Sequence, residues 1–199
     1  MSATVLYMSM SLDGFIAGPN EGPGNGLGDG GQRLHEWAMP EGDIDTIRRS
    51  GGVNDQVVDE FMSTGAVVAG RGTFELADGW GGDHHDGVPI FIVARGEPGI
   101  DISQWPLVTY VSDVASAMTQ AKEAAADKNV LVHGAGVTRL ALGAGVLDEI
   151  ELVGYTNSSV MLLGRIRGSV RRVGRVAGSE VVGGSRRDVD GVSASVASA

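Results

Sequence analysis

The amino-acid sequence predicts an α/β fold in which a parallel sheet is covered by helices. Short apolar runs rich in β-branched residues recur along the chain, and segments with helical periodicity lie between them. The apolar runs do not alternate with polar residues, which is typical of strands buried on both faces. Strands and helices that alternate in this way are joined by right-handed crossovers, which indicates an α/β architecture.

Several runs have the length and composition of strands. The expected strands cover residues 4–9, 66–69, 89–94, 108–111, 130–133 and 149–153. The last of them alternates acidic and apolar residues, so we expect it to be half exposed.

The segments between these strands predict helices. Asn54 is a candidate N-cap for a helix over residues 55–63, whose apolar side chains fall on one face. Asp113 is a candidate N-cap for a second helix. A third begins near Val137 and ends at one of the two glycines that follow residue 142.

Two segments break this pattern. Residues 18–31 are rich in glycine and proline, and we expect a long flexible loop of the kind that often serves as a lid. Residues 174–199 contain mainly Gly, Ser, Val, Ala and Arg with little periodicity, which predicts no regular structure. We therefore expect one domain over residues 1–160 and a divergent tail, disordered or read out of frame, over residues 161–199.

Composition narrows the function. The 199 residues suit one domain, and an apolar fraction of 42% suffices for one core. A net charge of -10 argues against a nucleic-acid binder. No apolar run is long enough to span a membrane, and no signal peptide is evident. Cysteine is absent, which removes disulfides, cysteine–zinc sites and thiol catalysis. We expect a cytoplasmic protein.

A glycine-rich turn over residues 70–75 follows the expected strand 66–69. Its glycines let the backbone approach a ligand closely. If Thr73 opens a helix, the first N–H groups of that helix favour an anion, and Arg71 adds a phosphate contact. Arg95, after the next expected strand, could join Arg71 in holding a 2′-phosphate, which favours NADPH over NADH. The alternative is an ordinary turn with solvated arginines.

A second turn over residues 133–138 follows the expected strand 130–133 and opens a helix. Its geometry suits a diphosphate, although it lacks the third glycine and the downstream acid of the Rossmann fingerprint. A single turn of this kind also occurs without a ligand. Two of them in one small domain indicate a dinucleotide, which carries two linked phosphates.

Other polar residues have weaker interpretations. Asp13 lies just past the first expected strand, where a carboxylate could relay a proton or simply form an Asp-Gly turn. Asp-His-His-Asp at residues 83–86 has the residue types of a metal site. Adjacent residues rarely converge on one ion, so we interpret this segment as a solvated loop and expect no metal. Nucleophile-elbow and Walker A motifs are absent, which leaves hydrolase and kinase functions without support.

Several segments together resemble the dihydrofolate reductase superfamily. Within this superfamily, they are most similar to one branch. That branch includes the C-terminal reductase domain of the bifunctional riboflavin-biosynthesis deaminase-reductase. The similar segments are residues 7–20 (YMSMSLDGFIAGPN), 68–75 (VAGRGTFE), 87–95 (GVPIFIVAR), 130–138 (VLVHGAGVT) and 146–152 (VLDEIEL). The match extends in order and spacing from Ala3 to about Val153.

The resemblance implies a mixed, mainly parallel sheet flanked by helices, with NADPH as the cofactor. It implies hydride transfer to a small-molecule substrate, which in the riboflavin branch is 5-amino-6-(5-phosphoribosylamino)uracil. Asp13 would face the cleft shared by cofactor and substrate, as the candidate catalytic residue, and residues 18–31 would form a mobile active-site loop. A homodimer is also expected. The implied cofactor-binding residues are Ser9, Ile16, Ala17, Gly70, Arg71, Thr73, Arg95, Gly134, Ala135, Gly136, Val137 and Thr138.

The sequence also departs from this family. His133 occupies a position where the family has a small residue, and the similarity ends in the tail after residue 160. Two other functions therefore stay open. One is reduction of a different heterocycle, such as a dihydropterin, and the other is nucleotide binding without catalysis.

Overall fold

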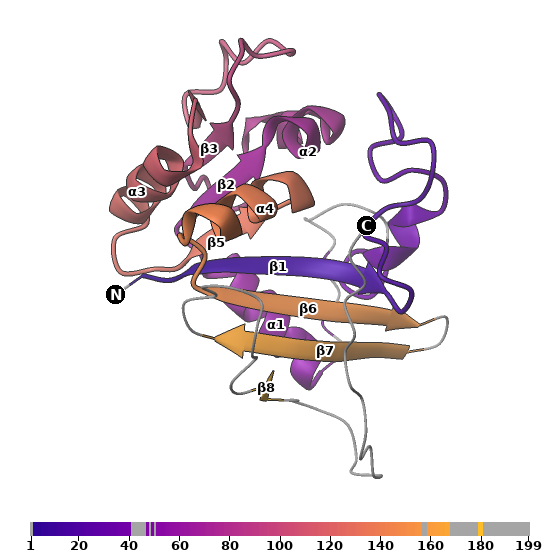
Figure 1. Ribbon diagram of the computed structural model, residues 1–199. Helices are drawn as coiled ribbons and strands as arrows, with labels where there is room; N and C mark the ends of the chain where they lie inside the picture. Colours follow the sequence, from indigo (N-terminus) through magenta and orange to yellow (C-terminus); the bar gives the residue numbers. More distant parts are fainter. Residues whose placement is uncertain are drawn as a thin grey trace.

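The computed structural model describes residues 2–40, 47, 49, 51–156, 159–167 and 179–180. In this part of the chain, eight strands form one sheet with the order β4-β3-β2-β5-β1-β6-β7-β8 (Figure 1). The strands are β1 (Thr4–Ser11), β2 (Ala66–Gly70), β3 (Ile90–Val93), β4 (Val108–Val111), β5 (Val130–His133), β6 (Glu149–Thr156), β7 (Ser159–Arg167) and β8 (Ser179–Glu180).

The sheet is mixed and mainly parallel, which confirms the expected fold class. Strands β1 to β6 pair in parallel, whereas β7 pairs antiparallel with both β6 and β8. The expected strands at 108–111 and 130–133 have the observed bounds, and the other four differ by a few residues at their ends. The expected exposure of β6 is wrong at Glu151, which is 1% exposed because its side of the strand faces the core that contains Val153.

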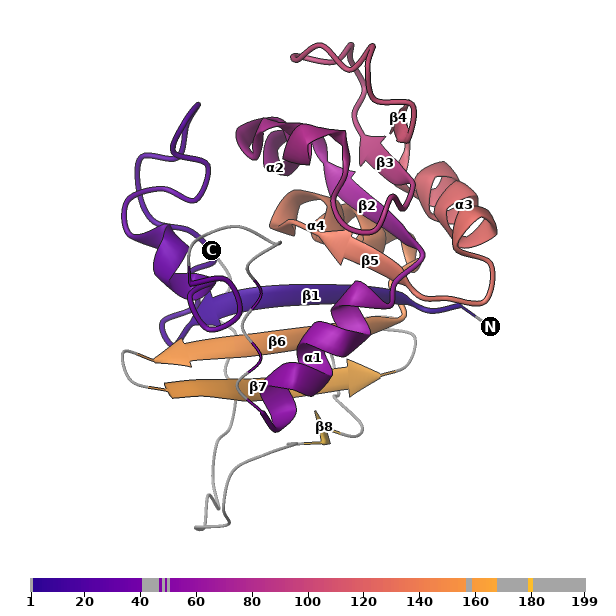
Figure 2. The ribbon, with the colours of Figure 1, turned by 180° about the vertical axis from the view of Figure 1, so that it is seen from behind.

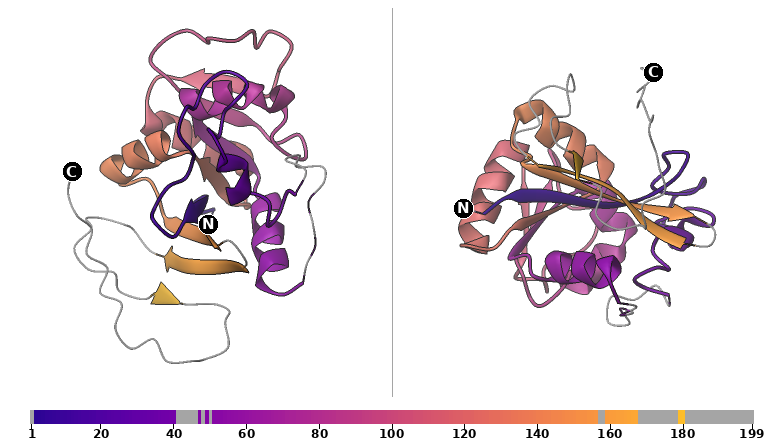
Figure 3. Two further views of the ribbon diagram at one scale, coloured as in Figure 1. Left: turned by 90° about the vertical axis from the view of Figure 1, so that its right-hand side faces the viewer. Right: turned by 90° about the horizontal axis from the view of Figure 1, so that it is seen from below.

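Helices cover both faces of the sheet. They are α1 (Val53–Met62), α2 (Arg71–Leu76), α3 (Val114–Ala125) and α4 (Ala135–Ala144), with short 3-10 turns η1 (Gly31–Leu34) and η3 (Asp78–Gly82). Figure 1 shows α3 and α4 in front of the sheet, and Figure 2 shows α1 on the opposite face. We call these the α3–α4 face and the α1 face. The right view of Figure 3 shows helices on either side of the strands.

The helix ends test the predicted caps. Asp113 is an N-cap as expected, and its carboxylate accepts a hydrogen bond of 2.8 Å from the Ser116 N–H. Helix α4 ends at Gly145, whose left-handed conformation suits glycine. The Asn54 cap is wrong, because α1 begins at Val53, two residues before the expected start, and its N-cap is Gly52.

Two buried clusters form the core, one on each face. The cluster on the α3–α4 face includes Val68, Val132 and Met118, and the cluster on the α1 face includes Leu131 and Phe74. Neighbouring residues of each strand enter opposite clusters, as expected for a parallel sheet buried on both sides.

The glycine-rich segment 18–31 has defined internal hydrogen bonds, and its expected flexibility stays a prediction. The N–H of Gly18 donates to Leu27 over 2.8 Å, and the N–H of Asp29 donates to Pro19 over 2.7 Å. A β-carbon on Gly26 would overlap the carbonyl of Leu76, so the loop lies directly against the end of α2. The left view of Figure 3 shows this loop at the carboxyl ends of the parallel strands.

The sheet extends beyond the boundary expected at residues 160 and 161. Strand β7 crosses that boundary and pairs with β6 along its length, and β8 adds a short pair to β7. The rest of the expected tail lies outside the described residues. None of the described helices has the length and apolar character needed to cross a membrane.

Candidate functional site

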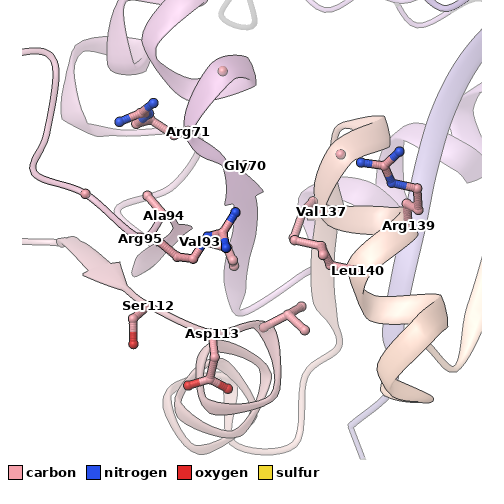
Figure 4. A pocket seen from close by; sticks show the side chains of 14 residues that line it. Gly70, Arg71, Val93, Ala94, Arg95, Ser112, Asp113, Val137, Arg139 and Leu140 are labelled. Carbon is pink, nitrogen blue, oxygen red and sulfur yellow. The ribbon is translucent and has the colours of Figure 1, made fainter.

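A cavity of about 940 Å³ opens at the carboxyl ends of β2, β3 and β4, beside the first residues of α2, α3 and α4 (Figure 4). Its volume is within the range of about 300–1,000 Å³ typical of small-molecule sites. The carboxyl ends of parallel strands are where ligands bind in open α/β sheets. The residues that line it are Gly70, Arg71, Gly72, Val93, Ala94, Arg95, Gly96, Ser112, Asp113, Val114, Gly136, Val137, Arg139 and Leu140.

The two glycine-rich turns of the sequence lie side by side at this cavity. A β-carbon on Gly70, the N-cap of α2, would be 3.7 Å from the backbone nitrogen of Val137 in α4. A β-carbon on Gly134, the N-cap of α4, would overlap the hydroxyl oxygen of Thr73 in α2. The first N–H groups of both helices are therefore close together, which suits a ligand with two anionic groups.

The floor of the cavity has room for phosphates. A β-carbon on Gly72 or Gly136 would meet no atom within 4 Å, so both helix starts face open space. Helix α2 begins at Arg71, which corrects the expectation that Thr73 opens it. The free N–H groups at this helix start consequently belong to the residues around Gly72, which line the cavity.

Three arginines surround the cavity in a protein whose net charge is -10. Arg71, Arg95 and Arg139 are exposed, and none of them forms an ion pair with a described residue. In Figure 4 the Arg95 side chain extends across the end of β2, whereas Arg139 lies on the far side of α4. Such guanidinium groups are suited to bind a phosphate in a bidentate manner.

The acidic group at the cavity already has a structural role. The carboxylate of Asp113 caps α3 through the Ser116 N–H. Ser112 lies beside it and makes a hydroxyl available to a neutral sugar or base.

The structure brings together one part of the predicted site. Gly70, Arg71, Arg95, Gly136 and Val137 line the cavity. Four further predicted residues, Thr73, Gly134, Ala135 and Thr138, belong to the same two helix starts. The Thr138 hydroxyl donates its hydrogen to the Gly134 carbonyl over 2.7 Å, so only its lone pairs remain for a ligand.

The remaining predicted residues lie elsewhere, at the end of β1. Ser9 is buried and accepts a hydrogen bond of 3.1 Å from Trp37 Nε1. Asp13 lies in an exposed turn and accepts a hydrogen bond of 2.5 Å from Ser11 Oγ. This residue does not line the cavity, and neither do the partly buried Ile16 and Ala17.

Residues 83–86 correct another expectation, because the two histidines there are not solvated. His84 and His85 are each 4% exposed, and their Nδ1 atoms are 2.8 Å apart. His85 Nε2 is 3.1 Å from Thr64 Oγ1, and that hydroxyl donates its hydrogen to the Phe61 carbonyl. His85 must therefore donate from Nε2 and accept at Nδ1, and His84 donates from its own Nδ1.

His84 belongs to a group that we call the histidine cluster, which is formed by His35, His84, His85 and His133. The rings of His84 and His133 have centroids 5.5 Å apart, and Trp80 packs edge-on against both. Burial lowers the pKa of His84 well below its usual value, with His133 and His85 adding to the effect. Burial, followed by the neighbouring His35, lowers the pKa of His133 to about 4.

The cluster is held by an unusual turn. Residues 78–81 have φ values between 51° and 62°, so Asp78 and Trp80 adopt a left-handed conformation that favours glycine. This turn places the Trp80 ring against His133. Within the described residues, no group of three or more His, Cys, Asp or Glu side chains could hold a metal ion.

Comparisons with known proteins agree with the expected fold. No protein family and no curated protein matches the sequence. A solved structure from Shewanella sp. PV-4, named "Putative riboflavin biosynthesis protein", is similar with a TM-score of 0.53 and 17% sequence identity. The similarity covers 77% of this chain and 76% of that chain. The chain therefore has the dihydrofolate-reductase-like fold of that protein, which confirms the resemblance at the level of fold.

Proposed function

We propose that this protein is an NADPH-dependent reductase of a small heterocyclic substrate. One observation carries the proposal: two adjacent helix N-termini and the guanidinium groups of Arg71 and Arg95 meet at one cavity. The linked phosphates of a dinucleotide suit the helix starts, and the additional 2′-phosphate of NADPH suits the arginines. NADH lacks the 2′-phosphate and therefore gains no binding energy from these arginines.

The cofactor supplies the hydride, and the protein binds it, orients it and excludes water. Gly72 and Gly136 would allow the backbone to approach the diphosphate, and Gly70 and Gly134 would hold the two helix starts close together. Arg71 and Arg95 would bind the 2′-phosphate, and Ser112 would be available to the sugar. The solved protein of the same fold is named for riboflavin biosynthesis, which supports a phosphoribosylated pyrimidine as the substrate. The proposed reaction is reduction of 5-amino-6-(5-phosphoribosylamino)uracil, in a homodimer of the chain.

The proposal is tested by titrating the purified protein with NADPH and with NADH and recording cofactor fluorescence. We expect saturable binding that favours NADPH, and we expect Arg95→Ala and Arg71→Ala each to weaken NADPH binding by about tenfold, the loss of one charge-assisted contact. NADH binding should change little in both variants.

Arg33→Ala is the matched control, because Arg33 is an exposed arginine outside the cavity. It should bind both cofactors as the unaltered protein does. A folded protein that binds neither cofactor, or that binds both equally well in all variants, would contradict the proposal.

A further inference from the structure

We propose that the His133 side chain positions the substrate by a hydrogen bond to an uncharged polar group, such as the amide edge of a heterocycle. This inference rests on the proposed reductase function and adds to it the residue that selects the reacting end of the substrate.

The first argument is an unmatched atom. His133 Nδ1 is the one buried side-chain nitrogen without a hydrogen-bond partner among the described residues. Buried polar groups are nearly always paired, so a histidine ring that makes no hydrogen bond within the described residues is unusual. Nδ1 itself is closed to solvent, whereas Nε2 is not among the closed unpaired atoms and the residue as a whole is only partly buried, so a ligand would reach the ring at its Nε2 edge.

The second argument is position. Val130 and Val132 of β5 enter the core on the α3–α4 face and Leu131 enters the core on the α1 face, so His133 lies on the α1 face. The residue that follows it is Gly134, the N-cap of α4. His133 thus lies across this glycine turn from the arginine-lined cavity. A dinucleotide with its 2′-phosphate in the cavity and its diphosphate on the turn has its opposite end near His133.

The third argument is the charge around the ring. Two aromatic rings pack against His133, those of Trp80 and His84, and its electrostatic neighbour is His35; none of the three carries a formal charge near neutral pH. Desolvation keeps His133 itself uncharged, through a pKa of about 4. A carboxylate or phosphate would lose its hydration there without gaining a counter-charge, whereas an amide gains a hydrogen bond.

The fourth argument is rigidity. His84 is fixed by its hydrogen bond to His85, which in turn binds Thr64. Trp80 is fixed by the left-handed turn at residues 78–81. Strained turns of this kind persist where surrounding structure holds them, and they cluster at ligand-binding sites. His84 and Trp80 therefore hold the His133 ring in one orientation before any ligand arrives.

The test uses the NADPH-loaded protein and two probes. Uracil presents the uncharged amide edge, and orotate presents the same ring with a carboxylate. Their dissociation constants and the ring-nitrogen NMR signals of His133 are measured in the unaltered protein and in His133→Asn, His133→Gln and His133→Phe. Asparagine places an amide near the position of Nδ1, and glutamine places one near Nε2.

We expect uracil to move the His133 signals and orotate to leave them in place. His133→Phe should weaken uracil binding by about tenfold, the loss of one hydrogen bond, and one of the two amide variants should recover it. The proposal is overturned if uracil leaves the signals unchanged, if His133→Phe binds uracil normally, or if neither amide variant exceeds His133→Phe.

The NADPH titration of the same variants separates this inference from the proposed function. Unchanged NADPH affinity shows that the fold and the cofactor site are intact. If the unaltered protein binds no NADPH, the proposed function fails, and uracil titration of the cofactor-free protein still decides whether His133 binds an amide edge.

Discussion

Gly134 and Thr73 are in direct contact, so that a β-carbon on Gly134 would overlap the Thr73 hydroxyl oxygen. Gly134 also has a φ of 101°, a backbone conformation that residues with a side chain rarely adopt. This glycine therefore sets the distance between the first turns of α2 and α4, and with it the geometry of the cavity.

Gly134→Ala should lower the free energy of unfolding by about 1–3 kcal/mol, because the backbone strain and the overlap act together. It should also weaken NADPH binding strongly, since the two helix starts must move apart. Urea unfolding and the cofactor titration measure these effects. Gly136→Ala is the control, because its new methyl group meets open space and α4 is helical there, so stability should be unchanged or rise by up to about 1 kcal/mol. Equal destabilisation by both substitutions would contradict the prediction.

The histidine cluster predicts a fall in stability at mildly acidic pH. The pKa of His133 is lowered from 6.5 to about 4 by burial and then by His35. Between these two values the unfolded chain binds a proton at this position that the folded protein excludes, so stability decreases as the pH falls from 6.5 toward 4. His133 alone should lower the free energy of unfolding by about 2 kcal/mol between pH 7 and pH 5. Urea unfolding at several pH values measures this slope.

His133→Phe provides the comparison for that slope, because it removes the titrating group and keeps a ring between Trp80 and His84. The variant should lose less stability on acidification than the unaltered protein. Identical pH profiles would show that the acid sensitivity comes from other groups.

Asp148 joins the start of β1 to α3. One carboxylate oxygen accepts hydrogen bonds from the Thr4 N–H over 2.9 Å, the Thr4 hydroxyl over 3.0 Å and Lys122 Nζ over 2.9 Å. Burial raises the pKa of Asp148, but these bonds outweigh it and lower the pKa below 3.8. The group therefore stabilises the fold above the unfolded-state pKa, and this contribution is lost as the pH falls through the lower folded-state pKa.

Asp148→Asn should reduce the free energy of unfolding by about 1 kcal/mol at pH 7, because an amide accepts these bonds less strongly than a carboxylate. Asp127→Asn, which alters an exposed acid in the turn after α3, should have no such effect. Thermal unfolding of the two variants at pH 7 tests this prediction, and equal melting temperatures would refute the assigned role of Asp148.

Ala126 follows α3 with φ 55° and ψ -110°, a conformation that glycine adopts far more readily. Its side chain is exposed, so the methyl group belongs to neither core cluster. Ala126→Gly should therefore raise the free energy of unfolding by about 1 kcal/mol, since relief of strain exceeds the entropy lost by glycine. Ala124→Gly, at an exposed position inside α3, should lower it by about 0.5–1 kcal/mol. Destabilisation by both changes would show that Ala126 is unstrained.

The sequence predicted the sheet well because its strands are buried on both faces, and continuous apolar runs such as 130–133 carry that signal without tertiary information. The helix starts after Gly70 and Gly134 were likewise predictable, because glycine between an apolar run and a helical pattern is typical of a tight strand-to-helix turn. Strand β7 was harder to predict. Its sequence has no clear turn after it, and its pairing depends on β6.

The histidine cluster could not be predicted from local sequence. His84 and His85 lie between two aspartates, which looks like a solvated segment, and only tertiary contacts with Phe61 and His133 bury them. The left-handed turn before them has a sequence signal in Asp78-Gly-Trp-Gly-Gly82, where three glycines surround one aromatic residue. The local sequence also could not predict that Asp13 lies in an exposed turn away from the cavity, because the distance between a residue and a cavity depends on the whole fold.

Strand β1 precedes the other described strands in the chain, and its two neighbours in the sheet are β5 and β6. Neither neighbour exists until residues 130–156 have been synthesised. Until then the growing chain carries an apolar strand with two open edges, which other chains or chaperones can bind. Closure of the sheet is therefore a late event in folding, in which β1 is inserted between two strands made more than a hundred residues after it.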